Sequence, residues 1–490
     1  MPGVLLILLI LMAGFFLAPT VIKAPVAIVA VGVGSFFLFL LLTNFEFGLM
    51  LILFVIPFSV QANLGSVAAG MPIDIGIDDF FIFCLFVTWL VYLGKTRQSP
   101  FVSTPFTWPF MAYLVACILS FLPMMASGKG SIGLSTLHLI KWYEYVFIYF
   151  VMARSLEHRS QIIHFTILAI ISAALVGILH FGQLLLGIAR GGSVYELIMT
   201  ANAGFQSNGI LGAYYVFFLM IVASFLAKMR RSMLRLGLFA LGGLLSFNLF
   251  YTYARAAYLG FVVGFIFLGF LHHKRLMFFS LLMLALLPAV LNKSISERIT
   301  YTIKVDPSQL NSLGYRMPAS GHGLHLYHKP IELKLDASSM ERIINWKKVK
   351  KIIYENFLLG TGYWSGRFLG LFGMSTSHNF YLTVFMETGV LGLLAFLWLS
   401  FTLIIVSIQL AHNSTDFVYD ALGKGFAAGY LGILVHCFFG ETFEDFRITG
   451  PVWMMAGIVA AAKHIQDEQR KAALAVANEP QNVRTKFSFT

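Results

Sequence analysis

Several segments place polar side chains inside or beside long apolar runs, where an uncompensated polar group is costly. One of them, STSHNFYLTVFMETGVLG at residues 375–392, puts His378 and Asn379 at the start of an apolar run and Glu387 within it. Histidine titrates near neutral pH and is a common general acid or base. A single histidine at a membrane interface is more often structural, so its interpretation depends on which groups share its side of the membrane.

Two arginines are candidates to share that side. Arg255, in YTYARAAYLG, stands at a tight corner between two apolar runs, and Arg342 lies near Trp346 in a segment with helical periodicity. The planar guanidinium makes forked hydrogen bonds that suit phosphate oxygens. Each arginine also has a structural interpretation. Arg255 could lie at the membrane interface with its guanidinium in water, and Arg342 could be a solvated charge on a surface helix.

A charged pair stands inside another apolar run. Lys141 and Glu144, in LHLIKWYEYVFIYF, are three residues apart, so on a helix they meet on one face. Such a pair in hydrocarbon is rare and usually faces a cavity or a partner. A functional pair and a self-satisfied structural pair both remain open.

The histidine-rich motif GHGLHLYHKP, residues 321–330, is a weak candidate for a metal site. Its three histidines recur at a spacing of three, but glycines and prolines disfavour the helix that would align them. We therefore expect no metal. The sequence also has no P-loop, no GxGxxG before a helix and no HExxH, so no ATP, dinucleotide or zinc-protease chemistry is indicated, and we expect no cofactor.

The elements that carry these residues are those of an all-α polytopic membrane protein. The chain of 490 residues is 58% hydrophobic and 11% charged, whereas soluble domains are about 25% charged. Its apolar runs are long enough to cross a hydrocarbon core, and we predict about 12–14 spans. The candidate spans are 3–18, 24–43, 47–61, 79–94, 107–123, 134–153, 161–187, 208–227, 235–253, 255–272, 276–291, 378–408, 423–440 and 448–464.

The charges of the loops predict the orientation of these spans. With a cytoplasmic N-terminus, clusters such as KMRRSMLR and HHKR lie inside, whereas the short outside loops hold only Lys23, Lys129 and Arg190. The long hydrophilic segment 292–377 is then outside. The formal net charge of +12 comes from such loops and does not indicate nucleic acid. We expect a transmembrane domain over 1–464, with that segment inserted, and a cytoplasmic tail over 465–490 that is disordered at its end.

The outside segment carries twelve Lys or Arg against six Asp or Glu. Its second half, DASSMERIINWKKVKKIIYENFLLGTG, predicts a basic amphipathic helix that lies on the outer membrane surface or over a cavity. On this topology, Arg255, Arg342 and His378 all lie at the outer face. Their shared position favours a functional role for the histidine.

The order of these motifs resembles that of the bacterial O-antigen ligase and polymerase superfamily. The Arg342 and Trp346 helix is followed by LLGTGYWSGRF and then by HNFYLTVFMETGVLG, which is similar to the family's HN-x-x-L leading into E-x-G-x-x-G. Upstream, YTYARAAYLGFVVG is similar to the family's S-R-g-a corner, with alanine in place of the serine. The matching segments extend from about residue 135 to 460.

The resemblance implies a GT-C-like helical fold and a metal-independent glycosyltransferase. Its donor is a glycan on undecaprenyl diphosphate, outside the bacterial inner membrane, and its acceptor is lipid A core or another lipid-linked repeat. His378 is then the candidate catalytic base, and Arg255, Arg342, Lys141 and Arg190 are candidate substrate-binding groups. Asn379, Glu387 and Glu144 are expected to support the site, with membrane lipids as the surrounding partners and no nucleic acid.

The alternative class is a secondary transporter or a lipid-linked oligosaccharide flippase. Such proteins also have many spans and buried charges such as Lys141 and Glu144. They do not need a long basic outside segment whose arginine works with a corner arginine and a histidine, and they usually show repeat symmetry, which is not evident in this sequence. The motifs therefore favour glycosyl transfer, while ligation and polymerisation remain equally open.

Overall fold

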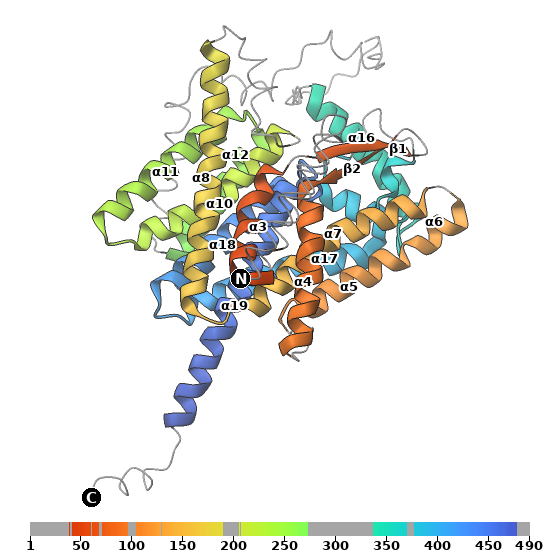
Figure 1. The fold of residues 1–490 in the computed structure, drawn as a ribbon. Coiled ribbons are helices and arrows are strands. Elements are labelled where there is room, and N and C mark those ends of the chain that lie inside the picture. The colour runs from red at the N-terminus through yellow and green to blue at the C-terminus, as the bar shows by residue number, and fades with distance from the viewer. Residues whose placement is uncertain are drawn as a thin grey trace, which may run out of the picture.

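The computed structural model describes residues 39, 42–59, 61–67, 71–96, 104–128, 130–189, 205, 207–272, 337–369 and 377–477. Within them, seven helices are long and apolar enough to cross a membrane. The predicted all-α polytopic fold is confirmed (Figure 1). The spans expected at 3–18 and 276–291, and most of 24–43, lie outside the described residues.

The helices and strands follow one another along the chain and are labelled in Figure 1. They are α3 (Phe45–Val55), η1 (Ile56–Phe58), β1 (Gln61–Val67), β2 (Met71–Gly76), α4 (Ile77–Thr96), α5 (Thr107–Leu119), α6 (Phe121–Ser127), α7 (Ile132–Ser155), α8 (Arg159–Ala189), α10 (Asn208–Lys228), α11 (Ser232–Tyr251), α12 (Arg255–His272), α16 (Ala337–Glu355), η3 (Ser365–Arg367), α17 (Phe380–His412), α18 (Phe417–His436), η4 (Thr442–Glu444) and α19 (Phe446–Ala477).

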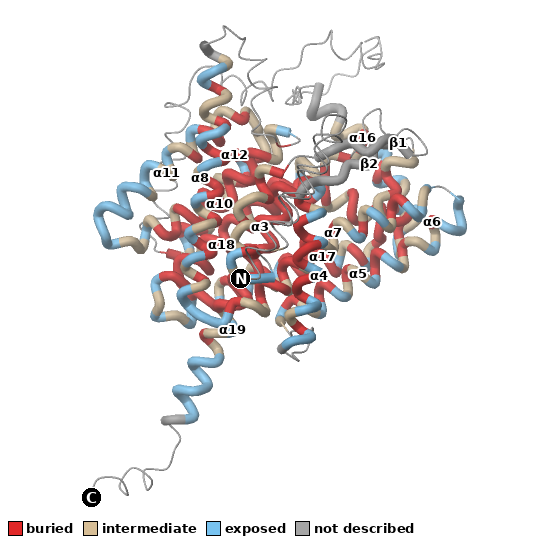
Figure 2. The backbone as a smooth tube through the Cα atoms, in the orientation of Figure 1, coloured by how far each residue is buried: buried red, intermediate tan, exposed pale blue. Residues whose placement is uncertain are grey.

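The centre of the bundle is formed by α10 and α18, with α12, α17 and α19 around them, and Figure 2 shows this centre as the most buried part. Small residues on α18 let the backbones approach closely, which is a common way for helices to associate in a membrane. A Cβ added to Gly432 of α18 would lie 2.9 Å from the carbonyl oxygen of Gly260 on α12, and one added to Gly429 would lie 2.7 Å from that of Phe217 on α10.

Two features differ from the sequence prediction. The loop expected after the span 47–61 contains an antiparallel hairpin, β1 and β2, with a register shift between Asn63 and Ser66. The last helix does not end near residue 464 but continues to Ala477. Ion pairs of Lys463 with Asp467 and of Lys471 with Glu468, at helical spacing, support this extension beyond the apolar segment.

The long helix α17 is broken at Gly389, whose φ of 69° and ψ of −172° belong to a region open almost only to glycine. The backbone of residues 357–362 packs into this break: Val390 N donates to the Phe357 carbonyl oxygen at 2.9 Å, and Gly362 N donates to that of Glu387 at 2.9 Å. The break therefore joins the segment after α16 to the helix that follows His378.

Replacing Gly389 with alanine should destabilise the protein by about 1–3 kcal/mol from backbone strain alone. The added Cβ would also lie 2.1 Å from the carbonyl oxygen of Leu358, so the docked segment must move. Thermal unfolding of the purified variant measures this loss, with Gly237→Ala on α11, where nothing lies within 4 Å of the added atom, as the control. Equal stability of the two variants would contradict the assigned close approach.

Candidate functional site

The start of α17 holds the histidine that the sequence singled out. Asn379 is the N-cap residue of the helix, and its Oδ1 accepts from Leu382 N at 3.1 Å. His378 precedes the cap with φ at +54°, a left-handed conformation uncommon for a non-glycine residue, and its side chain is half-buried. The helix begins at Phe380, so His378 lies in the turn before the helix and not on one of its faces.

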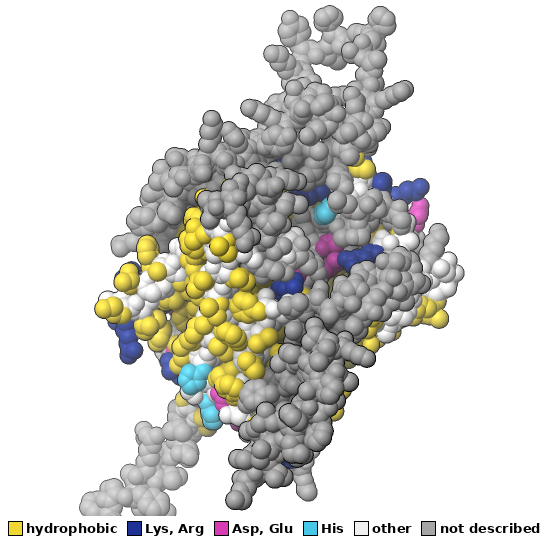
Figure 3. Space-filling model, turned by 45° about the horizontal axis from the view of Figure 1, so that its top comes forward, with side chains coloured by type: hydrophobic (Ala, Val, Ile, Leu, Met, Phe, Trp, Pro, Cys, Tyr) yellow, Lys and Arg dark blue, Asp and Glu magenta, His cyan; other side chains and the backbone are white. Residues whose placement is uncertain are grey.

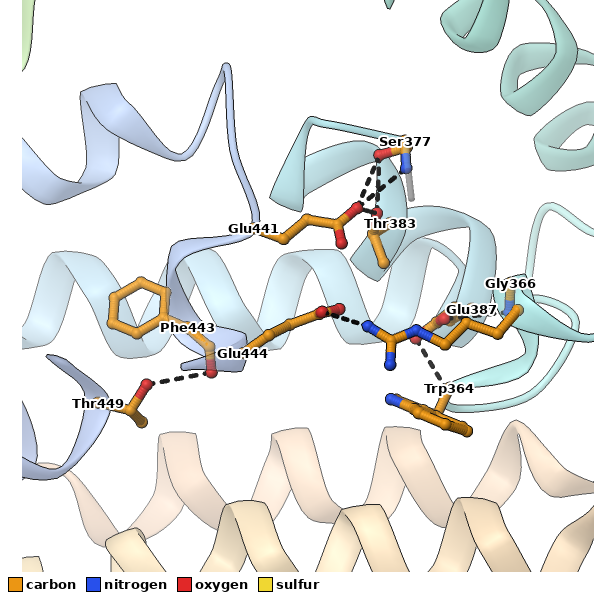
Figure 4. Close-up of polar contacts among 10 residues, drawn as sticks. Trp364, Gly366, Ser377, Thr383, Glu387, Glu441, Phe443, Glu444 and Thr449 are labelled. Atoms are coloured by element: carbon orange, nitrogen blue, oxygen red, sulfur yellow. Dashed lines mark hydrogen bonds and ion pairs between the residues drawn. The ribbon is translucent and has the colours of Figure 1, made fainter. Parts of the chain in front are cut away.

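The neighbour of His378 is held from two sides. The Ser377 carbonyl oxygen accepts from Trp346 Nε1 of α16 at 3.1 Å, and Ser377 N donates to Glu441 Oε1 at 3.0 Å. The same carboxylate oxygen accepts from Thr383 Oγ1 at 2.9 Å, as Figure 4 shows. These contacts fix the backbone that presents His378, and they come from segments far apart in the sequence.

The amphipathic helix predicted in the outside segment is present as α16. Its apolar residues Val349 and Ile353 are buried against a cluster that includes Met386 of α17. Because Trp346 reaches the His378 turn, Arg342, four residues earlier on the helix, lies on the same side of α16. The Arg342 side chain is half-buried. The structure therefore brings Arg342 and His378 to one region of the protein.

The corner that carries Arg255 lies at the same end of the bundle. The corner packs against α10, because a Cβ added to Gly212 would lie 2.6 Å from that of Ala257. One turn earlier, α10 begins beside His436, the last residue of α18. The carbonyl oxygen of the next residue, Cys437, accepts from Phe380 N at the start of α17 at 2.9 Å. Arg255 is the first residue of α12 and is half-buried. A chain of contacts thus links the corner of Arg255 to the start of α17 through the ends of α10 and α18.

Glu387 is buried within α17 and binds the backbone of the loop that docks there. Its Oε2 accepts from Trp364 N at 2.8 Å and its Oε1 accepts from Gly366 N at 3.2 Å. The carboxylate thereby satisfies backbone donors at the start of η3. The E-x-G motif thus has a structural explanation. The glutamate binds the loop, and Gly389 has no side chain that would prevent its close approach.

The same loop contributes residues that the sequence pattern did not single out. Arg367 Nη2 lies 2.6 Å from Glu444 Oε2, and the Arg367 guanidinium lies over the Trp364 ring at 4.6 Å. The Trp364 ring also stacks on the ring of His138 of α7, with the two ring centroids 3.6 Å apart. Glu441 and Glu444 come from the short segment GETFED between α18 and α19. That acidic run, in a loop that the charge pattern predicts to lie outside, was the available signal.

Lys141 makes an ion pair with a residue of another helix. The sequence spacing places Lys141 and Glu144 on one face of α7, but Lys141 Nζ lies 3.1 Å from Asp79 Oδ2 of α4, with the two side chains 24% and 16% exposed. Spacing along one helix could not reveal this partner. Glu144 is half-buried. Arg190 and the histidines at 322, 325 and 328 lie outside the described residues.

Acidic, basic and histidine side chains gather together on the face seen in Figure 3, beside apolar surface. Among the described residues, no group of three His, Cys, Asp or Glu side chains is arranged to hold a metal ion. What the arrangement offers instead is a half-buried histidine and two arginines near one end of the bundle, with three carboxylates that bind neighbouring backbone, hydroxyl or arginine groups.

The carboxyl group of Glu441 has an altered proton affinity. Burial, first, and the nearby charge of Glu444 raise its pKa well above the ordinary value, although Thr383 and Arg367 oppose this shift. A raised pKa means that the folded protein favours the protonated form. Stability from this group is therefore full below the ordinary glutamate pKa and declines as the pH rises through the higher folded-state pKa.

Replacing Glu441 with glutamine should remove that decline, because the amide oxygen still accepts from Ser377 N and Thr383 Oγ1 but the side chain has no proton to lose. Replacing it with alanine leaves buried donors without an acceptor and should cost about 1–3 kcal/mol. Thermal unfolding of the purified variants over a range of pH checks both. A glutamine variant with the full wild-type decline would contradict the assignment of the pH dependence to Glu441.

Comparison with known proteins gives one family match. A family model described as O-antigen ligase matches residues 240–397, a range that contains Arg255, Arg342, His378, Asn379 and Glu387. A comparison with curated proteins finds no match. The family match covers residues 240–397 of the 490 and, with the helical polytopic fold, supports the resemblance of the chain to the O-antigen ligase and polymerase superfamily.

Proposed function

We propose that this protein is a membrane glycosyltransferase that takes its glycan from an undecaprenyl-diphosphate-linked donor. The observation that carries the proposal is the link between α16 and the start of α17. Through Trp346 and Ser377, the helix of Arg342 is joined to the turn of His378 at the entrance of a membrane helix. A membrane-anchored diphosphate needs cationic groups at this interface, with a proton acceptor nearby.

We propose that the reaction is a single displacement. The acceptor hydroxyl oxygen attacks the anomeric carbon of the donor and forms the new glycosidic bond. The bond between that carbon and the diphosphate oxygen breaks, and its electron pair leaves with the lipid diphosphate. His378 takes the proton of the hydroxyl, while Arg255 and Arg342 stabilise the charge of the leaving group. Attack from the face opposite the leaving group inverts the anomeric centre.

The remaining residues of the site have supporting roles in this proposal. Asn379 caps α17, Glu387 fixes the docked loop, and Glu441 holds the backbone beside His378. Lys141 is a further substrate-binding candidate. To bind the substrate, its ammonium group must either leave Asp79 or contact Asp79 and the substrate together. We propose Arg190 for the same role because the loop charges predict that it lies outside the membrane.

The proposed location is the bacterial inner membrane, with the site facing outward and membrane lipids around it. The acceptor is a second glycan or a lipid-anchored core. A secondary transporter or flippase is the alternative. In that case, the charged groups at this end of the bundle would line a pathway for the transported molecule across the membrane.

Transfer of glycan by the purified protein is the direct test of this function. The protein in detergent receives the undecaprenyl-diphosphate-linked glycan and an acceptor, and the assay scores both the glycosidic product and the released lipid diphosphate. Product without ATP or another protein supports the proposal. Movement of intact donor across a proteoliposome membrane without any glycosidic product would favour the flippase. The glycans of cells that lack the gene then distinguish the two acceptors. If these cells make only short glycan chains, the protein is a polymerase. If they make long chains that are not linked to the lipid core, it is a ligase.

The orientation is predicted by the charges of the loops and can be tested by cysteine labelling. The three native cysteines are buried, so a cysteine introduced at an exposed position labels over a low background. Lys350→Cys on α16 should react with an impermeant reagent in intact spheroplasts, and Lys471→Cys near the end of α19 should react only after lysis. The reverse pattern would overturn the orientation and the outward-facing site.

A further inference from the structure

The end of the bundle opposite the candidate site contains a cavity. The helices α10 and α18 are antiparallel, so the end of α10 lies beside the start of α18. There Lys228 forms an ion pair with Asp420, far from His436 at the other end of α18. The cavity at this end has a volume of about 300 Å³ and is open to the surface. Its lining residues are Lys228, Leu271, Ile408, Ala411, His412, Ser414, Asp420 and Lys424. One water occupies roughly 30 Å³, so there is room for a phosphate group with hydration water.

The charges of the cavity converge from two helices. Lys228 Nζ of α10 lies 2.6 Å from Asp420 Oδ2, and Lys424 Nζ of α18 lies 2.7 Å from Asp420 Oδ1. Two ammonium groups thus share one carboxylate, so the cluster keeps a net positive charge. His412 and Ser414 line the same cavity and add hydrogen-bonding groups. An anion in the cavity would therefore meet several hydrogen-bond donors and two lysines whose charges Asp420 only partly neutralises.

The rim of the cavity is apolar on the side of α12 and α17. Leu271 and Ile408 line it. Nearby along these helices, Phe270 is 71% exposed and Ile405 is 52% exposed. In a membrane-spanning bundle, such exposed side chains belong in contact with acyl chains. The cavity is thus bounded by a cationic group on one side and by lipid-facing surface on the other.

We propose that this cavity binds the phosphate group of an anionic membrane lipid from the leaflet opposite the candidate site. The phosphodiester lies between Lys228 and Lys424, and the acyl chains run along the exposed surface of α12 and α17. The excess of basic residues on the cytoplasmic side explains lysines at helix ends in general. It does not explain why two of them converge on one aspartate inside a cavity. Basic pockets between membrane helices are a known way to bind lipid head groups.

Lipid binding to the purified protein tests this proposal. Native mass spectrometry or a fluorescence titration gives the apparent dissociation constants for dioleoylphosphatidylglycerol and for zwitterionic dioleoylphosphatidylcholine. The wild type should prefer the anionic lipid. Lys228→Gln should weaken binding of that lipid by about fivefold, the effect of one lysine near a membrane surface. Asp420→Asn should keep or tighten it, because the competing carboxylate is gone.

A matched control separates a lipid site from a structural ion pair. Lys463 also pairs with an aspartate four residues away, but it does not line the cavity. Lys463→Gln should leave the binding of the anionic lipid unchanged. If Lys228→Gln and Lys463→Gln bind it alike, the site is wrong, and loss of binding in a folded Asp420→Asn variant would mean that the cluster is only structural. Size-exclusion chromatography confirms folding, and the comparison of the two lysine variants stands even if Asp420→Asn does not fold.

Inorganic phosphate distinguishes the two sources of the same chemistry. Added in detergent without lipid, phosphate should bind far more weakly than the anionic lipid, because it lacks the contact of the acyl chains with α12 and α17. Binding of phosphate as tight as that of the lipid would overturn the assignment to a membrane lipid.

Discussion

Replacing His378 with alanine should lower glycan transfer by about 10²–10⁴-fold, the usual contribution of a positioned proton acceptor. Binding of the lipid-linked donor should remain, because it is assigned to Arg255 and Arg342. The backbone at 378 complicates this variant. Its φ of +54° disfavours most residues, so alanine adds strain to the loss of the imidazole.

A second substitution separates the two effects. Asparagine adopts the left-handed conformation more readily than alanine but is no base. His378→Asn should therefore keep the turn and the donor affinity while transfer stays as low as in His378→Ala. The purified-protein assay scores transfer and donor binding separately, and His464→Ala, an exposed histidine on α19, serves as the control. Wild-type transfer by a folded His378→Asn would show that position 378 serves only the turn.

Hydropathy and periodicity predicted the parts of the fold that depend on local sequence. The runs at 208–227, 235–253 and 255–272 correspond closely to α10, α11 and α12, because an uninterrupted apolar segment of this length has few alternatives to a helix in a membrane. The amphipathic pattern also located α16 in an otherwise hydrophilic segment, since Val349 and Ile353 fall on its buried side. These predictions required no knowledge of which segments meet.

The parts that the sequence did not predict arise where distant segments meet. The carboxylate of Glu441 reaches Ser377 across the interface of α17 with the end of α18, and nothing in the local pattern indicates that pairing. For the same reason, spacing places Glu144 beside Lys141 on one helix face, but it does not reveal Asp79, which the packing of α4 against α7 adds. The glycine at 389 is part of the family's E-x-G-x-x-G motif, but only the structure identifies the segment around Leu358 as the one that packs against it.

Replacing Arg255 with lysine should reduce transfer by about 10- to 100-fold, even though the positive charge is kept. Lysine is a point charge and cannot make the two parallel hydrogen bonds of a guanidinium to a diphosphate. Losing a hydrogen bond to a charged group costs about 1.5–3 kcal/mol, which sets this range. We expect the same for Arg342→Lys, since both arginines are assigned to one leaving group.

The measurement compares the two single variants and the double variant in the purified-protein assay, with the exposed Arg235→Lys on α11 as a control for the substitution itself. Two arginines that bind the same diphosphate act as a unit, so their effects should not add. The double variant should then lose less than the product of the two single losses. Strictly multiplicative losses would place the arginines at separate sites, and an Arg255→Lys variant with wild-type transfer would remove the corner of α12 from the site. His378 and α16 would then have to supply the chemistry without it.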